Sequence, residues 1–182
     1  MKALAIQASA NDDGLTAKCA QTALEGAKSA GAEIELVHLN QLNIQPCRAC
    51  DRGWGICRTE NRCIIEDDDF VSLRQKMNAA DALVFASPVY FSDITESARR
   101  FLERLRRCEA RRKNGSPLAG KPIIGIAAAG GSGAGAANTS LTLDTYLRRI
   151  GLKIADLFPI TRFNADYKLK AIQEAGRGLI AK

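Results

Sequence analysis

The stretch "DALVFASPVYFSDITESARRFLERL", residues 81 to 105, decides the fold class. Its first part, residues 81–88, is a near-continuous apolar run ended by a proline, which indicates a strand buried on both faces. Apolar residues then recur at helical spacing in a helix whose N-cap is expected to be Thr95 or Asp93. A buried strand followed by a loop and an amphipathic helix is the repeating unit of a parallel sheet covered by helices.

Further apolar runs continue this alternation along the chain. They are residues 2–8, 33–39, 121–129 and 152–160, and helical patterns separate most of the runs. Near-continuous apolar strands that alternate with amphipathic helices predict an α/β domain with helices on both faces of a parallel sheet. Five strands fit the smaller of the common doubly wound arrangements, the flavodoxin-like sheet with strand order 2-1-3-4-5.

The composition is that of a globular domain, because 46% of the 182 residues are hydrophobic and 25% are charged. We expect a single domain over residues 1–182, with a cysteine-rich insertion at about residues 40–69. No apolar run approaches the length that spans a membrane, and the N-terminal segment is typical of a first strand. We therefore predict a cytoplasmic protein without a membrane partner.

The formal net charge of +6 raises the question of nucleic-acid binding, and residues 99–115 hold much of the excess. Four arginines in this segment recur as on one face of a helix: Arg100, Arg104, Arg107 and Arg111. Glutamates precede basic residues by four positions here, and such interleaving is commoner on a solvated helix face. Few aromatic residues lie nearby to stack on bases. We predict a structural or interface role for this helix and no nucleic-acid partner.

The first of three unusual loops suits a phosphate. In open sheets of this type, ligands bind beyond the carboxyl ends of the strands, near the switch in strand order. The loop "SANDDGLT" (9–16) offers hydroxyl groups, a glycine and the free N–H groups of a helix N-terminus. Plain capping of that helix by Asn11, Asp12 or Asp13 is an equally good interpretation.

The second and third loops favour a flat ligand. In "SPVYFSDITES" (87–97), Tyr90 and Phe91 lie at a solvent-facing strand end, where large rings need a covering partner or must pack on the following helix. The loop "AAAGGSGAGAANTS" (127–140) is rich in glycine and alanine, so its backbone can lie against a ligand. Its G-x-G-x-x-A pattern is a weak dinucleotide signal, since it follows the fourth strand and lacks the acidic partner.

Taken together, "SPVYFSDITESARRFLERL", "AAAGGSGAG", "CRAC" and "CIIEDDDF" resemble the NADPH-dependent FMN reductase and iron-sulfur flavoprotein superfamily, a branch of the flavodoxin-like fold. The resemblance spans nearly the whole chain. It implies FMN at the switch point, with its phosphate on the first loop and its isoalloxazine ring between the second and third loops. The implied FMN-binding residues are Ser9, Asn11, Gly14, Leu15, Thr16, Pro88, Val89, Tyr90, Phe91, Ser92, Gly130, Gly131, Ser132 and Gly133.

The first loop departs from the pattern of this superfamily. Relatives have Gly-Ser-Pro-Arg or something close at its start, whereas this chain has "ASAN". Asp12 and Asp13 then lie beside the expected phosphate, and a like charge within about 6 Å is unfavourable unless it is solvated or turned away. We therefore expect weak FMN binding.

A cluster of cysteines follows the second strand, spaced C-x2-C-x6-C-x5-C: Cys47, Cys50, Cys57 and Cys63. About thirty residues between this strand and the helix at Phe70 show no convincing element, so the segment needs something to pin it. Because cytoplasmic thiols stay reduced, four soft thiolates suit tetrahedral zinc or a cubane iron-sulfur cluster. A dithiol redox pair and reduced thiols in a packed loop are the other interpretations.

The resemblance favours a [4Fe-4S] cluster at these cysteines. In iron-sulfur flavoproteins two residues separate the second and third cysteines, whereas here the spacer "DRGWGI" has six, a difference that ligand loops tolerate if their ends still meet. We expect Trp54, within this spacer, to pack over the loop.

Several other residues have structural interpretations. Cys19 and Cys108 occur in helical patterns and are expected to be buried thiols. Asp68 or Asp69 suits the N-cap of the following helix. His38 lies near a strand end without a predicted partner.

The sequence predicts an FMN-dependent oxidoreductase that transfers electrons, with a [4Fe-4S] cluster as its second redox centre and NAD(P)H as an electron donor. Its partner is a redox protein or a small-molecule acceptor, and we expect a homo-oligomer, a dimer or tetramer. One alternative is an NAD(P)H-dependent flavin or quinone reductase with zinc or no metal at the cysteines. Another is a non-enzymatic flavodoxin-like scaffold with a metal-stapled interaction loop. We assign no catalytic acid, base or nucleophile.

Overall fold

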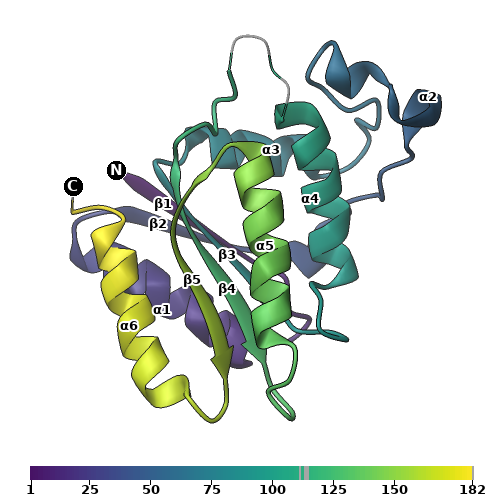
Figure 1. The fold of residues 1–182 in the computed structure, drawn as a ribbon. Helices are drawn as coiled ribbons and strands as arrows, with labels where there is room; N and C mark the ends of the chain where they lie inside the picture. The colour runs from purple at the N-terminus through teal and green to yellow at the C-terminus, as the bar shows by residue number, and fades with distance from the viewer. Residues whose placement is uncertain (111, 113–114, 182) are drawn as a thin grey trace.

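A five-stranded parallel sheet in the order β2-β1-β3-β4-β5 forms the centre of the molecule (Figure 1). The computed structural model describes residues 1–110, 112 and 115–181. The strands are β1 (Lys2–Gln7), β2 (Glu33–His38), β3 (Ala82–Pro88), β4 (Pro122–Ala129) and β5 (Lys153–Thr161). This confirms the predicted flavodoxin-like sheet, and every predicted strand boundary lies within one residue of the observed one.

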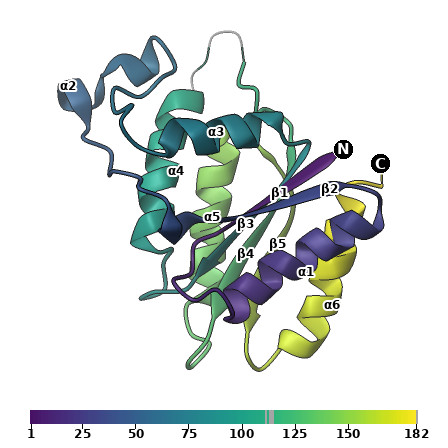
Figure 2. The same cartoon turned by 180° about the vertical axis from the view of Figure 1, so that it is seen from behind.

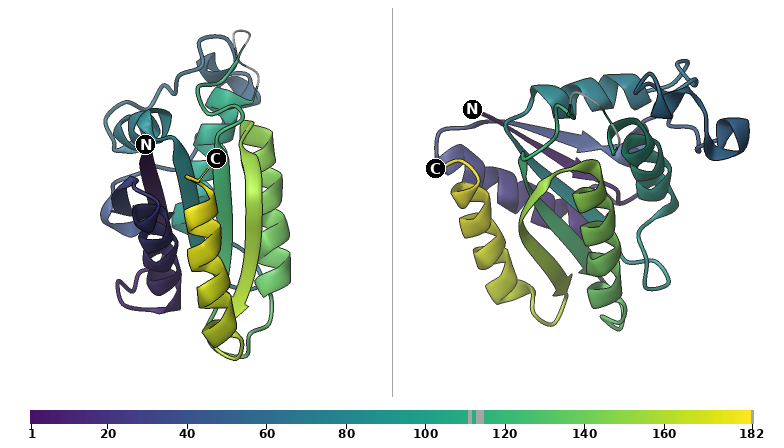
Figure 3. Two further views of the ribbon diagram at one scale, coloured as in Figure 1. Left: turned by 90° about the vertical axis from the view of Figure 1, so that its left-hand side faces the viewer. Right: turned by 45° about the horizontal axis from the view of Figure 1, so that its top comes forward.

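Helices cover both faces of the sheet (Figures 2 and 3). The long helices are α1 (Leu15–Ser29), α3 (Phe70–Ala79), α4 (Glu96–Glu109), α5 (Ala136–Ile150) and α6 (Ala165–Gly178). Buried side chains of α1 and α6 pack on one face, whereas those of α3, α4 and α5 pack on the other. No helix in the described ranges combines the length and apolar character that a membrane crossing requires.

The segment between β2 and α3 contains three short helical turns where the sequence predicted no element: η1 (Leu39–Gln41), α2 (Cys50–Gly53) and η2 (Ile56–Arg58). Neither α2 nor η2 buries a residue. Ala49, Asp51 and Arg52 have φ angles of 46°, 48° and 53°, in the left-handed region that side chains rarely adopt. Figures 1 and 2 show this segment beside the C-terminal half of α4.

Two predicted helix starts have different outcomes. Thr95 caps α4 as predicted, and its hydroxyl accepts a hydrogen bond from the Ala98 N–H at 3.2 Å. Asp69 occupies the N-cap of α3, but its own side chain makes no cap hydrogen bond. The carboxylate of Asp68 accepts a hydrogen bond from the Phe70 N–H at 3.1 Å. It also pairs with Arg104 of α4.

The sequence indicated a solvated basic face on α4. This was wrong for Arg104, which lies in the middle of that face and is buried. Arg104 is only 1% exposed, and its guanidinium carbon lies 4.2 Å from the centre of the Phe70 ring. Arg100 is exposed, Arg107 is partly buried, and Arg111 lies outside the described residues. Helical spacing alone could not reveal this burial, because the cysteine segment covers Arg104 from a distant part of the chain.

Two glycines let α1 and α6 approach at backbone contact. A Cβ at Gly176 would lie 2.0 Å from the carbonyl oxygen of Ala23, and one at Gly26 would lie 2.0 Å from that of Gln173. We expect Gly176→Ala to lower the free energy of unfolding by roughly 2 kcal/mol or more, because the helices must separate. Chemical denaturation measures this. Gly178→Ala, where a Cβ meets nothing within 4 Å, is the control and should not destabilise. Equal stability of both variants would contradict the close approach.

Candidate functional site

The loop after β1 presents uncapped N–H groups at the start of α1. Gly14 is the N-cap, no described side chain makes a cap hydrogen bond, and the first turn holds no acidic residue. The Ser9 hydroxyl instead accepts from the Asn11 N–H at 3.0 Å. The capping interpretation of Asn11, Asp12 and Asp13 is therefore wrong, and the N-terminus of α1 keeps free donors for an anion.

The side chain of Asp12 is turned toward the end of β2. Its carboxylate lies 2.8 Å from Nδ1 of His38 and accepts a hydrogen bond from Gln41 at 3.3 Å. The same His38 nitrogen lies 2.8 Å from Nε2 of Gln7, whose side chain is fully buried. The prediction that His38 lacks a partner was wrong. Because the Asp12 carboxylate is turned toward His38 and accepts from Gln41, it opposes a phosphate less than a free carboxylate would.

The three predicted loops meet at the carboxyl end of the sheet. The Thr95 hydroxyl, which follows β3, donates to the carbonyl oxygen of Ala8, which follows β1, at 3.3 Å. A Cβ at Gly135, after β4, would lie 2.6 Å from the Cα atom of Ser92, after β3. These contacts bring together residues that are distant in the sequence and were predicted to form one site.

Aromatic rings of the second loop stand open to solvent. Phe91 is 106% exposed and Tyr90 is 48% exposed. Phe91 and Ser92 have φ angles of 49° and 62°, and the backbones of Tyr90 and Asp93 exchange hydrogen bonds at 2.9 and 3.0 Å across this turn. The loop is thus held in a strained conformation that keeps Phe91 outside the protein core.

The third loop borders open space. A Cβ at Gly130 or Gly131 would meet nothing within 4 Å, and neither residue has a positive φ angle. Neither packing within the described chain nor backbone conformation therefore demands glycine at these positions. Gly133 differs, with a φ angle of 80° that favours glycine. The Ser132 hydroxyl accepts from the Ala134 N–H at 3.2 Å and shapes the turn.

Sequence reasoning missed a fourth loop, which follows β5. A Cβ at Gly133 would lie 3.1 Å from the Thr161 methyl carbon and 3.7 Å from the ring of Phe163. Phe163 is 70% exposed, and the guanidinium carbon of Arg162 lies 4.6 Å from the centre of its ring. The signal was a large aromatic residue at a solvent-facing strand end, the same signal that singled out Phe91.

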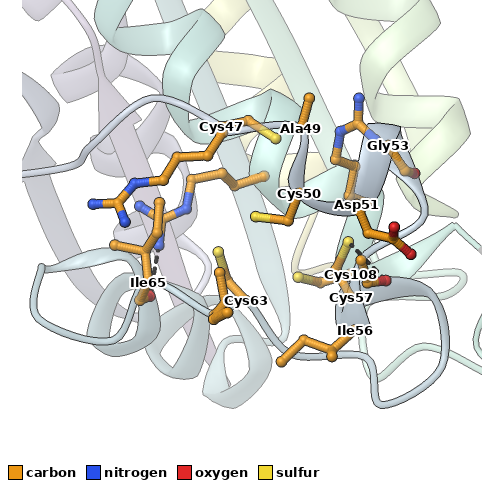
Figure 4. A pocket seen from close by; sticks show the side chains of 15 residues that line it. Cys47, Ala49, Cys50, Asp51, Gly53, Ile56, Cys57, Cys63, Ile65 and Cys108 are labelled. Carbon is orange, nitrogen blue, oxygen red and sulfur yellow. Dashed lines mark hydrogen bonds between the residues drawn. The ribbon is translucent and has the colours of Figure 1, made fainter.

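All four predicted ligand cysteines line one cavity of about 240 Å³ beside α4. Figure 4 shows the side chains of Cys47, Cys50, Cys57 and Cys63 around this space, together with that of Cys108 from α4. Cys108 is buried as predicted, but the sequence did not show that it faces the other four. All six cysteines of the chain are free thiols.

The cavity is wider than a single ion requires. Its volume equals that of about eight water molecules at ~30 Å³ each. Among the described residues, no three His, Cys, Asp or Glu side chains are close enough together to hold a metal ion. A tetrahedral zinc ion holds its thiolates at about 2.3 Å, so the cysteine side chains would have to move closer together to ligate a metal.

A buried arginine holds both ends of the cysteine segment. Arg104 donates to the carbonyl oxygens of Gln45 and Ile65, at 3.1 and 2.9 Å, just before the first and just after the last of the four cysteines. It also forms a fully buried ion pair with Asp68. Burial acts to raise the pKa of Asp68, but hydrogen bonds from Arg104 and from backbone N–H groups outweigh it and hold that pKa below its ordinary value.

Two arginines that line the cavity, Arg104 and Arg107, each have a buried Nε atom without a hydrogen bond to a described residue, although the Glu103 carboxylate lies 3.9 Å from that of Arg107. A buried donor is costly unless an acceptor is bound, and a guanidinium favours an anionic one. Burial also raises the pKa of the Cys57 thiol, so the loss of its proton on metal binding costs more than it would for an exposed thiol. The cysteines and the two arginine N–H donors of this cavity therefore suit an anionic group that contains sulfur.

Comparison with known proteins identifies the family of this chain. The family described as NADPH-dependent FMN reductase matches residues 1–156. The chain belongs to the NADPH-dependent FMN reductase family. It is 31% identical over 105 residues to an iron-sulfur flavoprotein of Archaeoglobus fulgidus, covering 58% of this chain and 46% of that protein. It is 37% identical over 82 residues to an iron-sulfur flavoprotein of Methanosarcina thermophila, covering 45% and 40%. The chain thus spans about half the length of these curated relatives or less.

Solved structures share the fold of this family member. A flavone reductase superimposes with a TM-score of 0.75 at 22% identity, over 99% of this chain and 62% of that one. The NAD(P)H:quinone oxidoreductase from Methanothermobacter marburgensis gives 0.73 at 18% identity, over 98% and 96%. An archaeal flavodoxin gives 0.64 at 12% identity, over 99% and 96%. At these identities the likeness shows the flavodoxin-like fold.

Arg104→Met should lower the free energy of unfolding by about 3 kcal/mol, because it leaves the Asp68 carboxylate buried without its partner. The fluorescence of Trp54, the single tryptophan, reports loosening of the cysteine segment during chemical denaturation. Arg100→Met, at an exposed position of the same helix, is the matched control and should change stability little. An Arg104→Met variant as stable as this control would show that the buried pair does not hold the segment.

Proposed function

We propose that this chain is an FMN-dependent oxidoreductase with a [4Fe-4S] cluster at its cysteine cavity. The observation that carries the flavin assignment is the meeting of an uncapped helix N-terminus, an exposed aromatic loop and an open glycine loop at one end of the sheet. Bound FMN would supply hydride and electron transfer, and the cluster would supply transfer of single electrons. NAD(P)H as donor rests on the family's description.

The three loops would bind different parts of FMN. The N–H groups of Leu15 and Thr16, behind Gly14, would donate to the phosphate, as helix N-termini do for anions. The backbone of residues 88–92 would lie against the isoalloxazine ring, and residues 130–133 would follow its other edge. Phe91 then gains the covering partner that its exposed ring lacks.

Support for the cluster comes from the charge and size of the cysteine cavity. Four thiolates around a cubane carry net negative charge, and the buried guanidinium groups of Arg104 and Arg107 would offset it and donate to sulfur through their free Nε atoms. The names of the curated relatives agree with this assignment. Zinc, a dithiol pair and plain reduced thiols are the alternatives that metal analysis separates.

The two centres would lie at opposite ends of α4. The flavin loops lie by its first turn, whereas Arg107 in the cysteine cavity is eleven residues beyond Glu96, about 16 Å along the helix at ~1.5 Å per residue. The cysteine segment also extends back toward the first turn of α4, because Cys47 lines a second hollow together with Glu96 and Arg99. A redox protein or a small-molecule acceptor would exchange electrons with one of the two centres. A homo-oligomer, a dimer or tetramer, remains a prediction.

Gly131→Val should weaken FMN binding at least tenfold, because its side chain enters the open space that the ring edge requires. Quenching of flavin fluorescence during titration of apoprotein measures the affinity. Gly178→Val, also at a position with open space but at the end of α6, is the matched control and should bind FMN as the parent does. Unchanged affinity of the Gly131→Val protein would refute the ring placement.

Anaerobically prepared protein should contain close to four irons and four acid-labile sulfides per chain, with a visible absorption band that air bleaches. Cys50→Ser should remove or destabilise this cluster, because it removes a cavity thiolate, while leaving much of the FMN binding. Cys19→Ala is the control, since this buried thiol, whose pKa burial raises to about 12, lies in the core on the other face of the sheet. One zinc and no sulfide would leave a reductase with a structural metal.

A further inference from the structure

A small hollow walled by arginines lies away from the flavin loops. Its volume is about 80 Å³, and it is lined by Arg58, Arg106, Arg107, Ala110 and Arg149. Arg58 belongs to η2, Arg149 to α5, and the other three to the C-terminal part of α4 and its C-cap. The fold brings these three elements together. None of the described residues that line the hollow carries a negative charge.

The described residues balance only part of this positive charge. Glu103 pairs with Arg106 at 2.6 Å and lies 3.9 Å from Nε of Arg107, so one carboxylate serves two guanidinium groups. The guanidinium carbon of Arg58 lies 3.7 Å from the centre of the Trp54 ring, and this contact leaves the full charge of Arg58 in place. Arg149 is exposed and adds a further charge at the rim. Like charges gathered in this way favour a bound anion.

The size of the hollow indicates the kind of anion. A volume of about 80 Å³ corresponds to two to three water molecules at ~30 Å³ each, which suits one tetrahedral oxyanion. Guanidinium groups match the oxygen geometry of phosphate and donate to it in pairs. A broader hollow of about 700 Å³ between α4 and α5 shares Arg106 and Arg149 with this one, and its lining also includes Tyr146 and the carboxylate of Glu103.

We propose that the arginine hollow binds a phosphate group, either free phosphate or the phosphate ester of a nucleotide whose remainder lies in the broader hollow. This site is distinct from the first loop, where the FMN phosphate is proposed to bind, and it does not depend on flavin. Arg107 lines both the arginine hollow and the cysteine cavity, so an anion bound here shares a cation with the thiols. The site thus lies next to the second proposed redox centre.

Isothermal titration of the FMN-loaded, anaerobically prepared protein tests this site, with inorganic phosphate and 5′-AMP as probes at fixed ionic strength. We expect saturable binding of one phosphate per chain. Arg58→Ala and Arg149→Ala should each weaken binding about tenfold, because each removes a charged donor. Arg107 is left unchanged, since it also belongs to the cysteine cavity. Arg177→Ala, on α6 and 3.9 Å from Glu174, is the matched control and should bind as the parent does.

The two probes separate the sources of the phosphate. Tighter binding of 5′-AMP than of phosphate, lost in Arg149→Ala, supports a nucleotide ester, whereas equal binding supports free phosphate. The absence of saturable binding would overturn the proposal. Parental affinity in both the Arg58→Ala and Arg149→Ala proteins would also overturn it. Flavin and iron contents, measured on the same samples, are expected to stay at parental values.

Discussion

The buried ion pair between Arg104 and Asp68 is the constraint on which the cysteine cavity depends. The segment that carries the cysteines has little core of its own, because neither α2 nor η2 buries a residue. The buried side chains of Ile44 and Ile65 pack at its two arms, and Arg104 on α4 adds polar contacts to the Asp68 carboxylate and to two backbone carbonyls on the same arms. A buried pair is costly to desolvate, and its main effect is to specify one arrangement of the chain.

Helix α4 connects the two proposed redox sites. Its N-cap, Thr95, reaches the loop after β1, where FMN would bind. Its C-terminal half carries Arg104, Arg107 and Cys108 into the cysteine cavity. The sheet fixes the first end of the helix through the strand order, and the cysteine segment fixes the other. One rigid element therefore sets the distance between a flavin site, which needs backbone donors and open space, and a cluster site, which needs thiolates and cations.

The parts of the fold that follow from local physics could be predicted from the sequence. The strands were placed within one residue. The inner strands β1, β3 and β4 are buried along nearly their whole length and so are nearly continuous in apolar character, whereas the edge strands β2 and β5 are partly exposed and still carry an apolar run. The burial of Arg104 could not be predicted, because helical spacing says nothing about which distant segment covers a helix. The contact of His38 with Asp12 and the approach of Phe163 to Gly133 were missed for the same reason. The positions of the proposed ligands of FMN and of the cluster remain predictions.

Anomalous diffraction at the iron edge, from crystals of anaerobically prepared protein, tests the central claim most directly. The account predicts a strong iron signal inside the cavity bordered by Cys47, Cys50, Cys57 and Cys63, next to the Arg104 guanidinium. A signal at the zinc edge alone, or a cavity that contains no metal in such crystals, would contradict the assignment of this flavodoxin-like protein as a carrier of two redox centres.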